Sequence, residues 1–180
     1  MTIKRCLLLP LLVVMLAGGT ARADDASRKR FAQKQEMLSR LWVFATLNYL
    51  YCDVVGLMDA KMLKQYGEGI VDGVRIDEGF LLGATILMQV PLSMVFLSTA
   101  LPPRASRVAN IAAGALMTGV QTATLFIGRP AKYYLFSSAV EIATTGFITA
   151  YALLAMKPPR VVPSVGATQD AVTMSVGFRF

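Results

Sequence analysis

The sequence contains no histidine and only two cysteines among its 180 residues, and just 16% of its residues are charged. Histidine is the commonest general base near neutral pH and the commonest metal ligand, so its absence removes most familiar enzyme chemistries. An average soluble domain carries roughly 25% charged residues. The low charge, together with 55% hydrophobic residues, therefore indicates a membrane protein and excludes a disordered chain.

The motifs that hold phosphates, dinucleotides, redox thiols or catalytic serines are also missing, since the sequence has no GxxxxGK[ST], GxGxxG, CxxC or GxSxG. We therefore predict no catalytic residue, no metal and no cofactor, and an enzyme is the less favoured class. The formal charge of +7 does not indicate nucleic acid, because the basic residues lie in pairs beside apolar runs instead of forming one patch.

The first 23 residues have the three parts of a secretory signal peptide: a basic start, about a dozen apolar residues, and Ala21-Arg22-Ala23 before Asp24. About a dozen apolar residues are too few to cross roughly 30 Å of hydrocarbon. We therefore predict a leader over 1–23 that is cleaved after Ala23. Cleavage would remove Cys6 and leave Cys52 without a disulfide partner.

Four apolar runs in the middle of the chain are long enough for transmembrane helices, and they cover residues 41–58, 79–101, 108–127 and 133–155. Short connections make the last three antiparallel neighbours. Buried helices of a soluble protein would show polar outer faces, whereas these runs are apolar nearly all round. We predict an all-α, polytopic membrane four-helix up-down bundle over 41–157.

The segments around the predicted spans differ from them in composition. A basic juxtamembrane segment covers 24–40. The loop at 59–78 combines DAKMLKQY, typical of a short interfacial helix, with Asp72-Gly73 between alternating apolar residues, which predicts a hairpin. In the tail at 158–180, the alternation over 172–180 resembles the closing strand of an outer-membrane barrel; the alternative is a disordered tail.

Basic residues flank one set of span ends more heavily than the other, and basic loops tend to stay in the cytoplasm. The heavier set holds Arg28, Lys29, Arg30, Lys34, Arg40, Arg104, Arg107, Lys157 and Arg160, and the lighter set holds Lys61, Lys64, Arg75, Arg129 and Lys132. We predict a multi-pass protein of the bacterial inner membrane with both ends of the bundle in the cytoplasm. A cleaved leader would instead export the N-terminus, and the two readings conflict.

The chain resembles a family of small bacterial four-helix membrane proteins, known only as a domain of unknown function, at LSRLWVFATLNYLYCDVVGLMDA, GFLLGATILMQVPLSMVFLS, RVANIAAGALMTGVQTATLFIG and YYLFSSAVEIATTGFITAYALL. The similarity covers about residues 37–157. It implies four spans with a longer loop after the first, and it implies no activity, cofactor or substrate. The leader and the tail depart from the family pattern, as they would if the two ends of an outer-membrane protein had been fused to an inner-membrane core.

Polar residues inside the spans are the candidates for function, because an acid at the centre of a membrane helix costs roughly 2.5–3.5 kcal/mol. Steps of four group Tyr49 with Asp53 and Glu141 with Thr145, and they join Thr85, Gln89 and Ser93 in the second span; Asn110, Gly114, Met117 and Gln121 share a stripe in the third. We expect these seams to face inward. The candidate site is Asp53, Glu141, Tyr49, Gln89 and Gln121.

Two readings of these seams remain open: hydrogen bonds that hold helices together, favoured for Asn48 and the other amides, or a proton or cation site at the two acids. The leading function is a small transporter-like or accessory membrane subunit. The alternatives are a membrane-embedded redox or lipid/quinone enzyme subunit and a structural module. Besides the lipid bilayer, the predicted partner is a second copy, bound through Gly79 and Gly83. Trp42 and Tyr49 are also expected in an aromatic belt at the membrane interface.

Overall fold

The structure is a computed structural model that describes residues 3–127 and 130–157, with side chains from residue 25 onward. This part of the chain is helical apart from one short hairpin, which confirms the predicted all-α class. Its elements are α1 (Ile3–Met58), α2 (Ala60–Glu68), β1 (Ile70–Val71), β2 (Val74–Arg75), α3 (Glu78–Ala100), α4 (Pro103–Thr124) and α5 (Lys132–Leu154).

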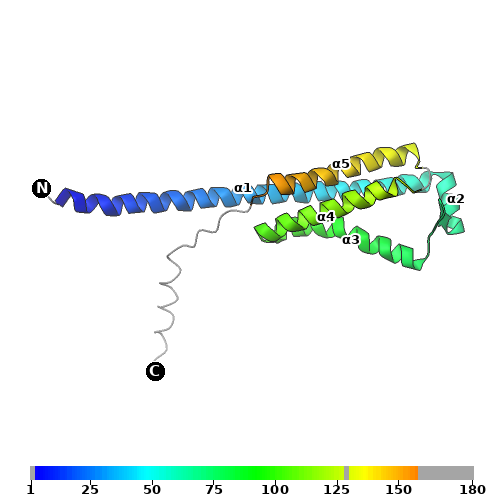
Figure 1. The fold of residues 1–180 in the computed structure, drawn as a ribbon, viewed down its shortest axis with the longest axis horizontal. Helices are drawn as coiled ribbons and strands as arrows, with labels where there is room; N and C mark the ends of the chain where they lie inside the picture. The colour runs from blue at the N-terminus through cyan, green and yellow to red at the C-terminus, as the bar shows by residue number, and fades with distance from the viewer. Residues whose placement is uncertain (1–2, 128–129, 158–180) are drawn as a thin grey trace, which may run out of the picture.

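The four long helices lie side by side and run in alternating directions (Figure 1). α1 packs beside α3 and α5, and α4 packs beside the same two helices. We call the end with α2 and the β-strands the hairpin end. The opposite end, formed by residues 25–40 of α1, the turn at 101–103 and the end of α5, is the basic end. The first part of α1 continues beyond the other helices (Figure 1).

The buried positions of α1 follow a repeat of about 3.5 residues, because each buried residue lies alternately four and three positions after the previous one. They are Phe31, Gln35, Leu38, Trp42, Ala45, Tyr49, Cys52 and Gly56. A stripe of this period keeps one face of a helix against its neighbours over many turns, as in left-handed helical bundles. The bundle therefore includes residues well before the predicted span start at 41.

Polar side chains close the basic end of the bundle. Lys34 Nζ donates to the carbonyl of Ala155 at 2.6 Å, and Arg107 Nη2 donates to that of Leu153 at 2.9 Å. Gln35 Nε2 donates to the carbonyl of Leu101 at 3.0 Å. The last carbonyls of a helix lack intrahelical donors, and positive charge there is favoured by the helix dipole. Part of the segment predicted as a separate basic flank therefore caps α3 and α5.

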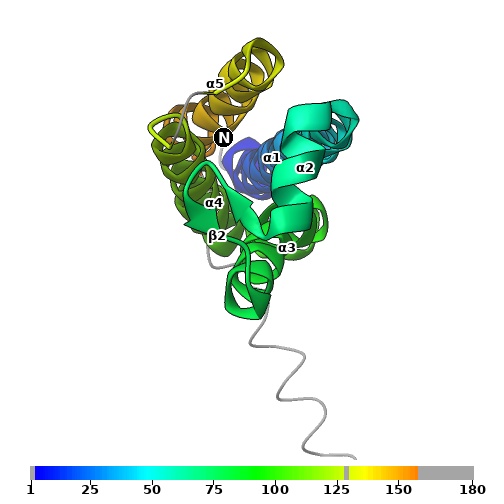
Figure 2. The same cartoon turned by 90° about the vertical axis from the view of Figure 1, so that its right-hand side faces the viewer.

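The hairpin end follows from local turn chemistry. Asp59 caps α2 by accepting from Lys61 N at 2.9 Å, and Gly69 ends α2 at φ 71°. Asp72 and Gly73 have φ values of 45° and 85°, as a two-residue hairpin turn requires. β1 and β2 pair antiparallel across this turn. The short helix and the hairpin predicted here are confirmed, and both lie across this end of the bundle (Figure 2).

α3 packs against the bundle only in its second half. Its buried residues are Pro91, Met94 and Ser98. Residues 77–86 are all exposed, and both views place this part of the helix away from the other three (Figures 1 and 2). The expected inward seam of Thr85, Gln89 and Ser93 is wrong, because these three residues are exposed.

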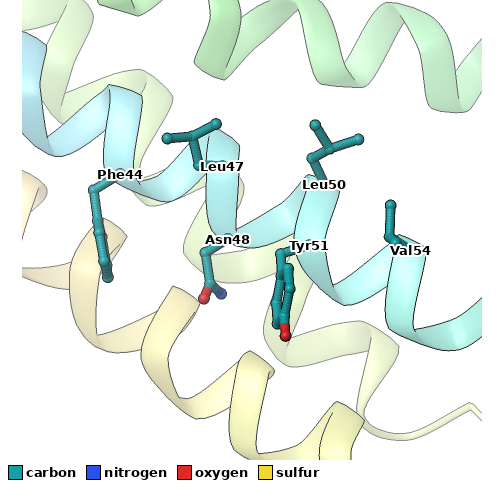
Figure 3. Close-up of a pocket in the computed structure, with 6 residues that line it drawn as sticks. All are labelled: Phe44, Leu47, Asn48, Leu50, Tyr51 and Val54. Carbon is teal, nitrogen blue, oxygen red and sulfur yellow. The ribbon is translucent and has the colours of Figure 1, made fainter.

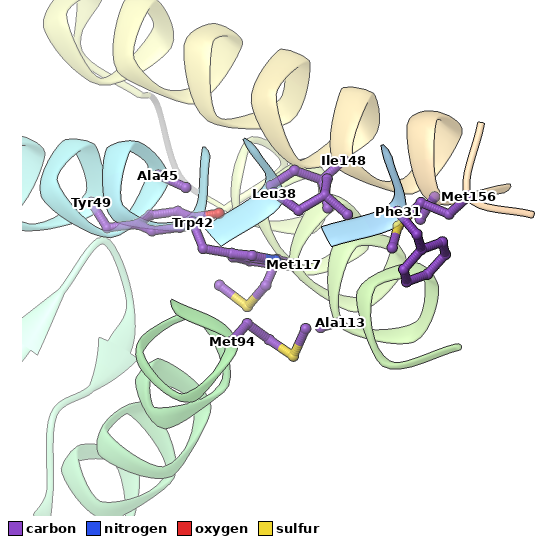
Figure 4. Close-up of a cluster of buried hydrophobic side chains, with 11 residues drawn as sticks. Phe31, Leu38, Trp42, Ala45, Tyr49, Met94, Ala113, Met117, Ile148 and Met156 are labelled. Carbon is purple, nitrogen blue, oxygen red and sulfur yellow. The ribbon is translucent and has the colours of Figure 1, made fainter. Parts of the chain in front are cut away.

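The hydrophobic core fills the half of the bundle nearer the basic end (Figure 4). It consists of Phe31, Leu38, Trp42, Ala45, Tyr49, Met94, Ala113, Met117, Ile148, Ala152 and Met156. Trp42 is fully buried, so its expected place in an interfacial belt is wrong. Its indole N–H is instead satisfied inside the protein, as a buried tryptophan requires.

Three helical segments of the described residues are long and apolar enough to cross a membrane: Asp25–Met58, Glu78–Ala100 and Lys132–Leu154. α4 is not among these three segments, although it is long enough, because its hydropathy is too low. Polar residues such as Ser106, Asn110 and Gln121 line its buried face, and these lower its hydropathy. The strand predicted over 172–180 lies outside the described residues. α1 is helical from residue 3, and cleavage of the leader stays a prediction.

Candidate functional site

Glu141 lies in the interior of the bundle with 1% of its surface exposed. It is about 14 Å along α5 from the start of the helix at Lys132, at a rise of 1.5 Å per residue. Asn48 of α1 donates from Nδ2 to Glu141 Oε1 at 2.9 Å. Among the described residues no cation pairs with this carboxyl group. A buried carboxylate without a cation is costly, so an amide donor and proton uptake are the ways to stabilise the site.

Tyr49 lies next to Asn48 on α1 and is 5% exposed. Its hydroxyl is buried and has no hydrogen-bond partner among the described residues. A buried hydroxyl without a partner costs roughly 1–3 kcal/mol, so this group can bind a ligand that donates or accepts one hydrogen bond.

Further polar pairs continue from Glu141 toward the hairpin end. Gln121 Nε2 donates to Ser138 Oγ at 2.8 Å, and both side chains are buried. Tyr134 donates from its hydroxyl to Thr124 Oγ1 at 2.7 Å, about one turn further on. These pairs join α4 to α5. They leave the interior of this half polar, in contrast to the hydrophobic core.

A second buried polar cluster lies within the hydrophobic core, toward the basic end. Trp42 Nε1 donates to Asn110 Oδ1 at 2.8 Å, and Ser98 Oγ donates to the same oxygen at 3.1 Å. Asn110 Nδ2 donates to the carbonyl of Ser106 at 2.8 Å, and Ser106 Oγ donates to the carbonyl of Ser98 at 2.7 Å. Asn110 thereby joins α1, α3 and α4. Its bonds are all internal, which is typical of a structural role.

Replacing Asn110 with leucine is expected to lower the free energy of unfolding by roughly 1–3 kcal/mol, the cost of a buried donor left without its acceptor. Leucine has a similar volume, but it leaves the Trp42 indole without its acceptor, whereas the Ser98 hydroxyl keeps its bond to the carbonyl of Met94 at 2.6 Å. Fluorescence of Trp42, the single tryptophan, reports unfolding in detergent. Gln89→Leu is the control, because it removes an exposed amide. Equal losses in the two variants would contradict the role of Asn110.

Only part of the predicted site comes together. Glu141, Tyr49 and Gln121 are buried in one region of the bundle. Asp53 is exposed, since the buried stripe of α1 passes from Tyr49 to Cys52, and Gln89 is exposed on α3. Asn48, predicted as packing, is the hydrogen-bond donor to Glu141. α1 and α5 run antiparallel, and Asn48 and Glu141 lie at similar depths in these helices, so the two residues are level with each other. This relation could have paired them from the sequence.

A shallow apolar groove of about 440 Å³ runs along the outer side of α1. Asn48 and Tyr51 are its polar lining residues, and both point toward α5 (Figure 3). The other lining residues are Phe44, Leu47, Leu50 and Val54. Asn48 therefore contacts Glu141 from a position at the edge of the bundle.

The described residues contain no group of three or more His, Cys, Asp or Glu side chains that could hold a metal ion. One buried carboxyl group with an amide donor and a free phenol can bind a proton, a water molecule or a small cation.

Residues 29–159 match a family of unknown function, DUF6326. The chain belongs to this family. The match to DUF6326 confirms the predicted resemblance to a domain of unknown function, and its start at residue 29 agrees with packing that begins at Phe31. No curated protein and no solved structure matches the chain.

Proposed function

We propose that this chain is a multi-pass membrane protein whose four long helices all cross the bilayer. Three of them are long and apolar enough by composition. α4 is compatible with a span because its polar residues face the bundle while Val108 and Leu116 are exposed on its outer side. Polar groups in membrane helices are tolerated where they face the interior of a bundle.

The proposed location is the bacterial inner membrane, with the basic end in the cytoplasm. Arg28, Arg30, Arg40 and Arg104 are exposed at this end, as the distribution of basic residues in membrane proteins favours. The leader-like start favours the opposite placement of the N-terminus. A reporter that works only outside the membrane, fused after Lys157, distinguishes the two, because it stays inactive in the proposed orientation.

We propose further that the protein is a small transporter-like or accessory subunit in which Glu141 binds and releases a proton. The observation that carries this proposal is the burial of Glu141 without a paired cation. Helix packing alone requires no ionisable group at this depth. A membrane acid facing the interior of a bundle is typical of proton and ion pathways.

The test is proton flux into vesicles that contain the purified protein. With an imposed potassium potential and a pH-sensitive dye inside, the wild-type chain is expected to acidify the vesicle lumen faster than empty vesicles do. Equal rates would contradict the proton-transfer role.

We also propose that a second copy of the chain packs against the first half of α3. Residues 77–86 are all exposed, and a Cβ atom added at Gly83 would meet nothing within 4 Å. Gly79 and Gly83 are four positions apart, the spacing that lets two membrane helices approach closely.

Replacing Gly83 with leucine is expected to convert a dimer into a monomer in detergent, because the larger side chain separates the two α3 helices. Light scattering coupled to size exclusion measures the mass. Gly119→Leu is the matched control, since Gly119 lies on α4 with open space around it. A monomeric wild-type protein, or a dimer that survives Gly83→Leu, would contradict the interface.

A further inference from the structure

We infer that, in the conformation described, water and protons reach Glu141 from the hairpin end alone while the hydrophobic core closes the path from the basic end, so that proton transfer across the bilayer requires the core to open transiently. The inference rests on the proposed function and adds the direction of access to it. It is drawn from the unequal chemistry of the two halves of the bundle interior.

The interior between Glu141 and the hairpin end is lined by groups that bond to water. Cys52 of α1 lies about one turn beyond Asn48 and is buried. Gln121 and Ser138 lie at a similar depth, and Tyr134 and Thr124 follow closer to the end. Polar side chains from three helices thus lead from this end to the carboxyl group. A buried water molecule requires such partners.

The interior on the other side of Glu141 is apolar. Beyond the Thr118 and Thr145 hydroxyls, which lie 2.8 Å apart, Met117 and Ile148 fill the space between the helices. Leu38, Met94, Ala113, Ala152 and Met156 continue the core to the basic end (Figure 4). The Asn110 cluster within this half satisfies its own hydrogen bonds. Its polar atoms therefore offer no continuous path to Glu141.

Tyr49 marks the boundary between the two halves. Its ring belongs to the hydrophobic core, whereas its hydroxyl is buried without a partner among the described residues. A buried hydroxyl without a partner is a place where a water molecule or another small hydrogen-bonding ligand can bind. The first half of α3 lies apart from the other helices at this end, and its residues 78–86 are all exposed (Figures 1 and 2).

The test compares two positions on the same face of α1, one on each side of Glu141. Cys52 is the native probe toward the hairpin end, and Ala45→Cys places the same thiol two turns toward the basic end. Cys6→Ser is present throughout, and Cys52→Ser accompanies every introduced cysteine. A charged, membrane-impermeant methanethiosulfonate is added to one side of the membrane at a time. Lys61→Cys and Arg104→Cys, both exposed, mark the two sides.

Cys52 is expected to react from the side that labels Lys61→Cys and not from the other, and Ala45→Cys is expected to react from neither. Labelling of position 45 from the Arg104→Cys side, equal labelling of Cys52 from both sides, or an unreactive Cys52 would overturn the inference. Ala113→Cys replaces Ala45→Cys if the latter fails to fold. Labelling can be measured without flux, so the two proposals can fail separately. Flux that depends on Glu141, together with equal labelling from both sides, would contradict the access route alone. The expected labelling pattern without any flux would contradict the proposed function alone.

Discussion

Replacing Glu141 with glutamine is expected to abolish proton flux in reconstituted vesicles and to leave the fold intact. Glutamine has nearly the same shape, and its amide oxygen can accept the bond that Asn48 donates to Oε1. The neutral side chain removes the cost of burying a charge without a paired cation. It cannot bind and release a proton, so a pathway through this position stops. The measurement is the initial rate of acidification of the vesicle lumen.

Asp53→Asn is the matched control, because it also removes one carboxyl group from a long helix of the bundle. Asp53 is exposed and lies off the buried stripe of α1. This variant is expected to retain proton flux. The assignment of the site fails if Glu141→Gln conducts like the wild type while its unfolding temperature is unchanged. It fails equally if both variants lose flux to the same extent.

The positions of the helices could be predicted closely from the sequence, because they depend on local properties. The apolar run predicted at 79–101 is the helix Glu78–Ala100, and the run at 133–155 is Lys132–Leu154. The hairpin followed from Asp72 and Gly73, because aspartate tolerates the positive φ found there and glycine, without a Cβ atom, adopts it freely. Length, hydropathy and turn chemistry require no knowledge of the neighbouring helices.

The inward faces of α1 and α3 could not be predicted as well, whereas the residues expected to face inward in the third and fourth spans are buried: Asn110, Gly114, Met117 and Gln121, with Glu141 and Thr145. Steps of four residues advance about 40° beyond a full turn, so a seam drawn through Thr85, Gln89 and Ser93 drifts away from the buried face. The observed stripes alternate steps of four and three, as in Pro91, Met94 and Ser98 of α3. The same drift explains why Asp53 is exposed. The buried stripe of α1 steps by three residues from Tyr49 to Cys52, whereas the predicted seam steps by four from Tyr49 to Asp53. Helices that are apolar nearly all round give little other indication of which side packs.

Gly114 is the position where α4 and α5 approach most tightly among the glycines of the described helices. A Cβ atom placed there would overlap the hydroxyl of Thr149 and lie 3.0 Å from the carbonyl oxygen of Thr145. In a bilayer such close contact holds helices together, because lipid gives little hydrophobic driving force. Gly114→Leu is therefore expected to lower the free energy of unfolding by roughly 1–3 kcal/mol through overpacking. The loss exceeds the gain of about 1 kcal/mol from removing glycine inside a helix.

Gly119→Leu separates these two effects, because a Cβ at Gly119 meets nothing within 4 Å. This control is expected to match or exceed wild-type stability, so the difference between the two leucine variants measures the contact between α4 and α5. Trp42 fluorescence during chemical unfolding provides the comparison. Separation of α4 from α5 would also break the bond between Gln121 and Ser138, so Gly114→Leu should reduce proton flux under conditions where it still folds. Equal stability of the two variants would show that the bundle can widen at Gly114 without loss.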